Sequence, residues 1–450
     1  MRQSAPPAQR RELLGLLAPL RVRSVRLLWL AKLASEVGDW AGRLALAILV
    51  YEQSRSPLAT AAVTAVSLAP WLGLGQVLTA VTERYAHRSV MVCADLLRLL
   101  CFAVLALVHL PVGVLLAVAF LAAAATPPFE GARAAVLPAA CGLDATASPA
   151  RDDGAAERLY GQALRLFNAT FQTGLLVGYA AGGLLVALIS TRGALLVDAA
   201  TFAVSAALVA GLPGSRRPAG DTGPGTDAAS LAPAPTARAR LATACRVLRQ
   251  DRLLGWSVLL MVGAAAACMA AESLLVVFCT AYAGGAPVST GLVSAVVPLG
   301  ALLATPLLPG SGEHAGLVRL SAVVTVAGAG ASGALLLLVP DLWTGLLVFA
   351  VLGGLSVLTI PLGAVLGARL PRENRATCFS VVQGALMVAQ AGAAAVSGAL
   401  ADVVPVATAI ALLCLPALVL GVAGLVGAPV RRLLPDPEDN TQVVAGTSPG

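Results

Sequence analysis

The sequence predicts an all-α polytopic membrane protein, with 12 transmembrane helices arranged as two pseudo-symmetric halves of six. Its 450 residues are 58% hydrophobic and 12% charged, whereas soluble domains are about half apolar and about a quarter charged. So little charge cannot cover a soluble surface of this size, and so much apolar sequence excludes intrinsic disorder. The apolar runs are continuous rather than alternating, which favours helices over a membrane β-barrel.

Twelve apolar runs are long enough to be spans, since a helix needs about 20 residues to cross a bilayer. Several runs are separated only by a proline, a glycine or a single charge, which predicts tight hairpins. The predicted spans are 27–51, 58–81, 89–110, 112–129, 160–189, 193–212, 254–281, 288–309, 318–339, 342–368, 377–401 and 404–427.

The arginines support this topology and orient it. With the N-terminus in the cytoplasm, 24 arginines fall in cytoplasmic segments, and only Arg55 and Arg192 fall outside. Cytoplasmic loops carry an excess of basic residues, so an even number of spans and cytoplasmic N- and C-termini are expected. A single lysine against 29 arginines is typical of a high-GC bacterial genome, which suggests a bacterial inner (plasma) membrane. The net charge of +7 therefore indicates topology, and no nucleic-acid partner is expected.

The spans divide the chain into five parts. Residues 213–237 are rich in Pro, Gly, Ala and Ser, which predicts a flexible linker, and 238–252 predict a basic amphipathic helix on the inner leaflet. The parts are a cytoplasmic tail at 1–26, an N-terminal six-helix bundle at 27–212, a cytoplasmic linker with this helix at 213–252, a C-terminal six-helix bundle at 253–427 and a cytoplasmic tail at 428–450.

A parallel repeat relates the two bundles. A shift of 230 residues places Pro57 on Pro287, each at the start of a span. A shift of 215 places Gly183 on Gly398, each in the fifth span of its half. Many transporters are built from such repeats. Chance matches of Gly and Pro are the alternative in so biased a composition.

Span 1 holds the densest charge at membrane depth. Lys32, Glu36, Asp39 and Arg43 are spaced by 4, 3 and 4 residues, so they share one helix face. Charges are costly in lipid, and this face is expected to line a central cavity. Two carboxylates three residues apart repel each other when both are ionised, so one is expected to bind a proton near neutral pH. Asp39, near mid-span, is the first candidate for proton coupling and Glu36 the second. The alternative is a static ladder of Lys32 with Glu36 and of Asp39 with Arg43.

Other polar residues within the spans extend the candidate cavity. Asp198 and Glu272 are isolated acids in spans 6 and 7, which suits a proton or a cationic substrate, or else a solvated outer vestibule. Amides within spans hydrogen-bond across helices or bind a polar ligand. Those that share a face within spans 5 and 11 are Asn168, Gln172, Gln383 and Gln390.

A second charge cluster is expected at the cytoplasmic ends of spans 2 and 3. Asp95 and Arg98 are one helical turn apart at the inner end of span 3. We interpret the cluster as a cytoplasmic gate that latches the outward-facing state, with simple solvation of the loop as the alternative. Its residues are Glu83, Arg84, Arg88, Asp95 and Arg98.

Span 5 carries small residues suited to close helix packing. Gly174, Gly178 and Gly182 recur at every fourth position, and Gly183 follows. This spacing lets two helix backbones approach closely. The expected partner is span 8. Its small residues are Gly291, Ala295 and Gly300.

The chain resembles the major facilitator superfamily over nearly its whole length. The loop after span 2 is similar to the family's G-x-x-x-D-R-x-x-R-R motif and keeps Arg84 and Arg88. Thr79, Glu83 and Ser89 stand in place of its Gly, its Asp and its last Arg. The resemblance implies the family's fold of two six-helix halves.

Three segments look like the enterobactin-exporter and macrolide-efflux branch of the drug/proton antiporters. They are Gly38-Asp39, Ala94-Asp95-Leu96-Leu97-Arg98 and the stretch 197–205, VDAATFAVS. Residues 174–183 are similar to the antiporter motif G-x-x-x-G-P-x-x-G-G, with Tyr179 in place of Pro. The Arg found within span 4 of many such antiporters is absent, because Arg133 lies near the cytoplasmic end.

The resemblance implies a secondary active transporter and no enzyme. We expect proton-coupled efflux, by alternating access, of a small, largely apolar molecule such as a drug, an antibiotic or a secondary metabolite. The alternatives are an importer or facilitator of the same fold, and a transport-impaired membrane sensor or scaffold. The sequence has no G-x-x-x-x-G-K-[ST] motif, so no nucleotide cofactor and no ATPase subunit are expected. Three scattered histidines and eight scattered cysteines predict no metal site, and a monomer in the lipid bilayer is expected.

Overall fold

The computed structural model of the chain describes residues 17–72, 77–78, 85–143, 153–213, 237–308, 313–371 and 373–427. Within these ranges all regular structure is helical. The helices are η1 (Ala18–Arg21), α2 (Arg23–Ser54), α3 (Pro57–Leu68), η2 (Ala69–Leu72), α5 (His87–Leu107), α6 (Val112–Ala124), α7 (Thr126–Ala140), α8 (Asp153–Ala210), α9 (Ala237–Gln250), α10 (Arg252–Ser273), α11 (Leu275–Tyr282), α12 (Pro287–Ala304), η3 (Thr305–Leu307), α13 (His314–Leu338), α14 (Leu342–Ser356), α15 (Thr359–Arg369), α16 (Arg375–Ala401) and α17 (Val406–Gly427).

Twelve transmembrane helices are built from these elements. In the described ranges, nine helices are long and apolar enough to cross a membrane. One of the nine, α8, counts as spans 5 and 6, because the backbone at Ser190 leaves the helical region, with φ at 78°, and bends the helix in two. The long, charged α2 and the shorter α3, extended by η2, are spans 1 and 2.

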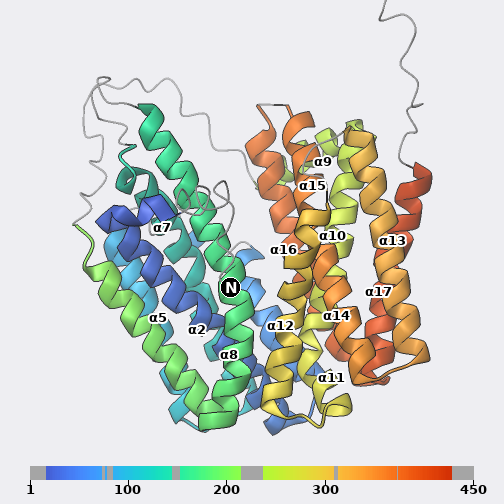
Figure 1. The fold of residues 1–450 in the computed structure, drawn as a ribbon, viewed down its shortest axis with the longest axis horizontal. Helices are drawn as coiled ribbons and strands as arrows, with labels where there is room; N and C mark the ends of the chain where they lie inside the picture. The colour runs from blue at the N-terminus through green and yellow to red at the C-terminus, as the bar shows by residue number, and fades with distance from the viewer. Residues whose placement is uncertain are drawn as a thin grey trace, which may run out of the picture.

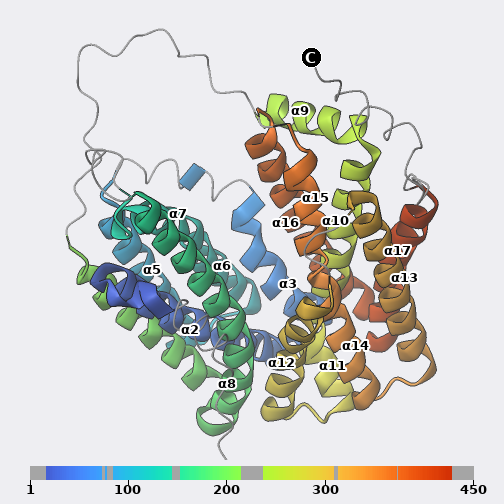
Figure 2. The same ribbon diagram turned by 45° about the horizontal axis from the view of Figure 1, so that its top comes forward.

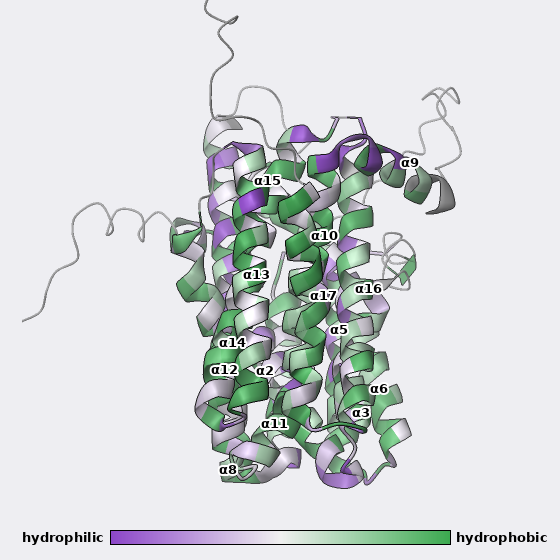
Figure 3. Ribbon diagram, turned by 90° about the vertical axis from the view of Figure 1, so that its right-hand side faces the viewer, coloured by the Kyte–Doolittle hydropathy of each residue, from purple (hydrophilic) through white to green (hydrophobic). Residues whose placement is uncertain are grey.

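The spans form two six-helix halves that lie side by side (Figures 1 and 2). The N-terminal half runs from α2 to α8, and the C-terminal half from α10 to α17. We call the end where α2 begins and α9 lies the linker end, and the end where α2 finishes the hairpin end. Apolar residues cover much of the helix surface between these ends, and hydrophilic residues gather around α9 (Figure 3). This distribution suits a bilayer with an apolar core.

Each half repeats the construction of the other. Both α3 and α12 begin at a proline, Pro57 and Pro287, and both continue into a 3-10 turn. The fourth span of each half is broken into two helices, at Ala125 between α6 and α7 and at Val357 between α14 and α15. The shift of 230 residues therefore corresponds to a structural repeat.

Glycine contacts join the two halves near the hairpin end. Gly183 in α8 packs on Gly291 in α12, and Gly398 in α16 packs on Leu58 in α3. A Cβ atom at Gly183 would lie 2.5 Å from the Pro287 carbonyl oxygen, and one at Gly398 would lie 2.7 Å from Leu58 Cα. Both positions thus require glycine. The shift of 215 residues that places Gly183 on Gly398 therefore relates two equivalent contacts between the halves.

The halves diverge from the hairpin end toward the linker end (Figure 1). Among the described residues, polar bonds between the halves join the Ser56 hydroxyl and the Leu58 N–H to Asp402, each at 3.4 Å near the hairpin end, and Tyr179 to Glu272 further along α8. Closer to the linker end, Gln172 on α8 and Gln383 on α16 are exposed. The structure is therefore closed at the hairpin end and opens toward the linker end.

Two predicted span boundaries are wrong. Span 4 continues through α7 to Ala140 instead of ending at 129. Pro127 and Pro128 lie in the first turn of α7, where proline is tolerated because its missing N–H has no helical partner there. Span 5 begins at Asp153 rather than at 160. The first correction brings Glu130 into the interior of a span.

Candidate functional site

The charged face of span 1 points into the N-terminal half. Lys32 and Glu36 form an ion pair one helical turn apart. Lys32 Nζ also donates to Glu130 Oε1 on α7 at 2.9 Å, and Arg133 Nη2 donates to Glu130 Oε2 at 2.5 Å. Two cations thus meet two carboxylates, so this branch of the network balances its own charge.

A second branch connects spans 1, 3 and 6 through Arg98. Arg98 Nη2 donates to Asp95 Oδ1 at 2.6 Å, and Arg98 Nη1 lies 3.6 Å from Asp39 Oδ2. The second oxygen of Asp95 accepts a hydrogen bond from Ser205 Oγ at 2.7 Å. The Arg98 side chain is 3% exposed, whereas that of Asp39 is 31% exposed. Asp39 is therefore the most exposed member of this branch.

The predicted static ladder along span 1 forms only by half. Lys32 does pair with Glu36, but the partner of Asp39 is Arg98 rather than Arg43. The Arg43 guanidinium lies instead over the Trp40 ring, 4.3 Å from its centroid. The Asp39 carboxylate pairs with Arg98 on α5 rather than with a residue of its own helix. Spacing along one helix cannot predict such a contact.

Asp198 lies beside this branch, on the span-6 part of α8. The residue is 1% exposed, and its carboxylate rests against α2 at Gly38 and Gly42. Thr201 Oγ1 lies 3.3 Å from Asp198 Oδ1. Asp198 therefore does not lie in a solvated vestibule, since it is buried in the polar core of the N-terminal half.

Glu272 connects the two halves. The Tyr179 hydroxyl on α8 donates to Glu272 on α10. The Tyr179 ring packs edge-on against Trp40, with centroids 5.3 Å apart, and Trp40 Nε1 donates to Glu36 at 2.9 Å. A bridge of polar and aromatic groups thus leads from the C-terminal half to the charges of span 1. Its central residue, Tyr179, is the one that replaces the proline of the antiporter motif.

The predicted partner of the span-5 glycines is wrong for Gly174, Gly178 and Gly182. Cβ atoms at these three positions would meet α2, at nearest distances of 2.5, 2.6 and 2.8 Å. Span 5 therefore packs closely on the charged helix of its own half. Gly183, about 100° further round the helix, does face span 8 at Gly291.

The four candidate amides lie away from the buried network. Asn168, Gln172 and Gln383 are exposed and Gln390 is half-buried. The first three occupy the part of the halves that diverges toward the linker end. This exposure favours contact with solvent or a ligand over interhelical hydrogen bonding.

The residues of the predicted gate do not all lie together. Glu83 and Arg84 are outside the described residues. Arg88 is in the first turn of α5, whereas Asp95 and Arg98 lie deeper along that helix and are 0% and 3% exposed. Asp95 and Arg98 bond to span-1 and span-6 side chains, so the structure places them in the buried network.

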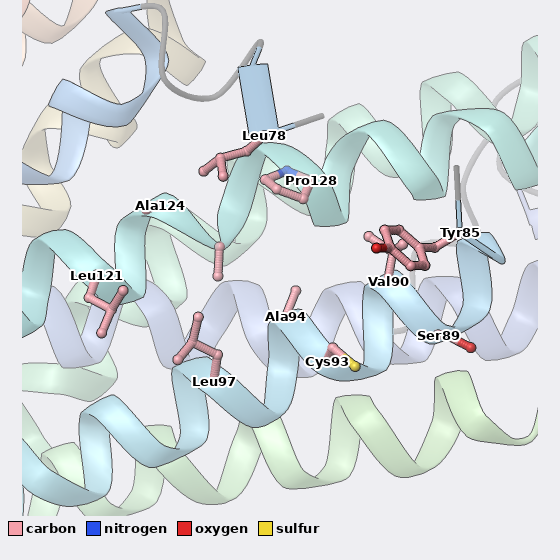
Figure 4. A pocket seen from close by; sticks show the side chains of 11 residues that line it. Leu78, Tyr85, Ser89, Val90, Cys93, Ala94, Leu97, Leu121, Ala124 and Pro128 are labelled. Atoms are coloured by element: carbon pink, nitrogen blue, oxygen red, sulfur yellow. The ribbon is translucent and has the colours of Figure 1, made fainter. Parts of the chain in front are cut away.

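An apolar cavity of about 440 Å³ lies within the N-terminal half beside α5 (Figure 4). Its lining includes Ala94, the neighbour of Asp95, but no carboxyl group. The cavity therefore suits an apolar molecule rather than an ion. Its lining residues are Leu78, Tyr85, Ser89, Val90, Cys93, Ala94, Leu97, Leu121, Ala124, Ala125 and Pro128.

Sequence reasoning missed Glu130 and treated Arg133 as a residue at the end of a span. The i, i+3 spacing of Glu130 and Arg133 is a readable signal for an ion pair on a helix. Taking Pro127 and Pro128 as the end of span 4 hid that signal. Ser205, the partner of Asp95, carries no such signal, because only the packing of α8 on α5 brings the two together.

No protein-family model matches the chain, and no curated protein matches its sequence. Solved structures do match over most of its length. The nucleoside transporter NupG superposes with a TM-score of 0.68 at 13% identity, covering 91% of this chain and 100% of that one. A POT family transporter in complex with a thioalcohol-conjugated peptide gives 0.66 at 12% identity, covering 90% and 96%.

A third structure is a bacterial homologue of the human lysosomal transporter Spinster, in an inward-facing and unoccupied conformation. It gives a TM-score of 0.60 at 14% identity, covering 90% of this chain and 95% of that one. These three structures have the major facilitator fold, and this chain shares it. At such low identity the likeness defines the fold alone.

Proposed function

We propose that this protein is a secondary active transporter that works by alternating access. One observation carries the proposal: Asp39, a partly exposed carboxyl near the middle of span 1, is connected to the buried Arg98 and Asp95. Ionisable groups inside a membrane are costly and usually serve a transport path. The divergence of the halves at one end, and the transporters that share the fold, support the same reading.

The transport we propose is proton-coupled efflux of a small, largely apolar molecule such as a drug, an antibiotic or a secondary metabolite. The support is the resemblance of segments in spans 1, 3 and 6 to the enterobactin-exporter and macrolide-efflux branch. The proton gradient is the driving force, and the transporter acts as a monomer without an ATPase subunit. Import is the second candidate, because proteins described as nucleoside and peptide transporters share the fold. A transport-impaired sensor or scaffold is the third, because the loop motif departs from the family at Thr79, Glu83 and Ser89.

In this proposal the linker end faces the cytoplasm of a bacterial cell and both termini are cytoplasmic. The support is the excess of arginines on that side of the predicted topology. The conformation is then inward-facing, and Asp39 exchanges protons with the cytoplasmic side.

The test is transport in proteoliposomes with an imposed pH gradient. The probes are a fluorescent apolar dye, a radiolabelled nucleoside and a radiolabelled dipeptide, so that efflux and import substrates are both represented. We expect the dye to move uphill against proton entry, and Asp39→Asn to abolish this uphill movement while sparing downhill exchange, because asparagine keeps the shape and cannot titrate. Uphill transport by Asp39→Asn at the unmodified rate would make Asp39 structural. Movement of none of the probes would favour the sensor or scaffold.

A further inference from the structure

We propose that Asp198 holds the coupling proton in the conformation described above and exchanges it with Asp39. The role of this proton in transport rests on the proposed function, whereas its presence on Asp198 does not. The observations that carry the inference are a notch in α2, a carboxyl without a cation and the charge balance around Arg98.

The notch is formed by Gly38 and Gly42, which flank Asp39 on α2. A Cβ atom at Gly38 would lie 2.5 Å from Asp198 Oδ1, and one at Gly42 would lie 2.0 Å from Asp198 Oδ2. Any larger residue would therefore displace the carboxyl. The two glycines let the Asp198 side chain lie directly on the backbone of the helix that carries the proposed coupling residue.

Asp198 has no cationic partner among the described residues. Its Oδ1 lies 3.3 Å from Thr201 Oγ1, whose one proton has a nearer acceptor in the Asp198 backbone carbonyl oxygen at 2.7 Å. Its Oδ2 is fully buried without a hydrogen bond in the described part of the chain. The residue is 1% exposed, so water does not solvate it in bulk. An unpaired carboxylate in such a place is very costly, and a bound proton removes that cost.

The charges around Asp198 also favour a proton on this residue. The charged groups of the polar contacts around Asp198 at membrane depth are Lys32, Glu36, Asp39 and Arg43 on α2, Asp95 and Arg98 on α5, Glu130 and Arg133 on α7, and Glu272 on α10. Lys32 forms ion pairs with Glu36 and Glu130, and Arg133 pairs with Glu130. Arg43 keeps its charge over the Trp40 ring, and in the described part of the chain Arg98 is the one cation within salt-bridge distance of any of the three carboxylates, Asp39, Asp95 and Asp198.

Arg98 is already shared between Asp95, at 2.6 Å, and Asp39, at 3.6 Å. With all three acids ionised, this branch would carry two uncompensated negative charges at membrane depth. One proton on Asp198 leaves Asp39 and Asp95 as the two acids that Arg98 holds. The geometry therefore points to Asp198 as the protonated member.

In this proposal the proton exchanges with solvent through Asp39. The Asp198 O–H bond breaks and an O–H bond forms on Asp39, whose side chain is 31% exposed and can release the proton to water. The transfer within the branch leaves its total charge unchanged, and release of the proton from Asp39 to water then makes the branch more negative by one.

Infrared spectroscopy of the full-length protein in lipid vesicles tests the site without any substrate. A protonated carboxyl has a carbonyl-stretch band distinct from that of a carboxylate. We expect such a band at neutral pH in the unmodified protein and its loss in Asp198→Asn. The matched control is Asp341→Asn, at an exposed helix start, which should leave the band unchanged. A folded Asp198→Asn protein that keeps the whole band would overturn the proposal.

Thr201→Val gives a second route if Asp198→Asn does not fold. This variant preserves the side-chain shape and removes the hydroxyl that lies 3.3 Å from Asp198 Oδ1. We expect the band to shift in frequency, because the carboxyl group of Asp198 loses a polar neighbour. An unshifted band in folded Thr201→Val would place the proton on another residue and sink the proposal.

Transport measurements distinguish a failure of this inference from a failure of the proposed function. Asp198→Asn should lose the uphill, pH-driven movement of the fluorescent dye as completely as Asp39→Asn does. If the unmodified protein moves none of the probes but the infrared band is lost in Asp198→Asn, the proposed function fails and the proton site stands. If Asp198→Asn concentrates the dye like the unmodified protein, the exchange with Asp39 is wrong.

Discussion

Arg98 is the residue on which the buried network of the N-terminal half depends. Its guanidinium bonds to Asp95 and approaches Asp39, and it lies between the rings of Phe129 and Phe202, at 4.8 and 4.6 Å from their centroids. Aromatic faces stabilise a desolvated cation. The site therefore suits arginine, which is planar and stays charged at every working pH.

We expect Arg98→Leu to destabilise the protein by about 3–5 kcal/mol, because it leaves the buried charge of Asp95 uncompensated. The double variant with Asp95→Asn should recover a large part of this loss, since it removes the stranded charge as well. Thermal unfolding in detergent measures both. Arg319→Leu, at an exposed arginine, should change stability little. A double variant as unstable as the sum of its single changes would show that the pair is not coupled.

At the scale of helices, α16 and α3 form one of the contacts that close the hairpin end. Gly398 allows their backbones to touch, and it is the counterpart of Gly183 between α8 and α12. Two interfaces related by the internal repeat thus hold the same end shut. Side chains at these glycines would force the halves apart there.

We expect Gly398→Leu to shift the population toward a conformation open at the hairpin end, because the new side chain overlaps Leu58. Spin labels attached through Gln53→Cys and Val403→Cys, both exposed near this end, should report a longer distance. Gly384→Leu is the matched control on the same helix, since a Cβ there meets nothing within 4 Å. An unchanged distance in Gly398→Leu would mean that the contact does not hold the halves together.

At the scale of the whole molecule, the orientation in the membrane decides which side supplies the protons. We expect a membrane-impermeant maleimide added outside cells to label cysteines placed in the outer turns and to miss those placed on the cytoplasmic side. The background replaces the two exposed native cysteines, Cys93 and Cys245, by serine. The labelled variants should be Arg55→Cys and Arg192→Cys. The protected ones should be Arg217→Cys and Arg432→Cys. Labelling of Arg217→Cys from outside would invert the proposed orientation.

The fold could be predicted because its causes are distributed along the sequence. Continuous apolar runs define most spans by the length a bilayer requires. The two errors at span boundaries arose where local chemistry was ambiguous. Pro127 and Pro128 can end a helix or begin one, and only their place in the first turn of α7 decides between the two.

The candidate site could be predicted in part. The i, i+4 pairing of Lys32 with Glu36 and the i, i+3 pairing of Asp95 with Arg98 are local, and the structure contains both. The partner of Asp39 is not local, since it comes from α5, 59 residues further along the chain. Periodicity assigns a residue to a helix face but does not state which helix covers that face.

The sequence by itself determined the class of molecule, the number of spans, the repeat and the identity of the charged helix. These properties follow from hydropathy, arginine placement and spacing within one helix. Only the tertiary structure decided which charges meet. It pairs Glu130 with Lys32 and Arg98 with both Asp39 and Asp95, and it places the Asp198 carboxyl against Gly38 and Gly42 of α2. The physical reason is that a buried charge is stabilised by its nearest partner in space, and packing between helices chooses that partner.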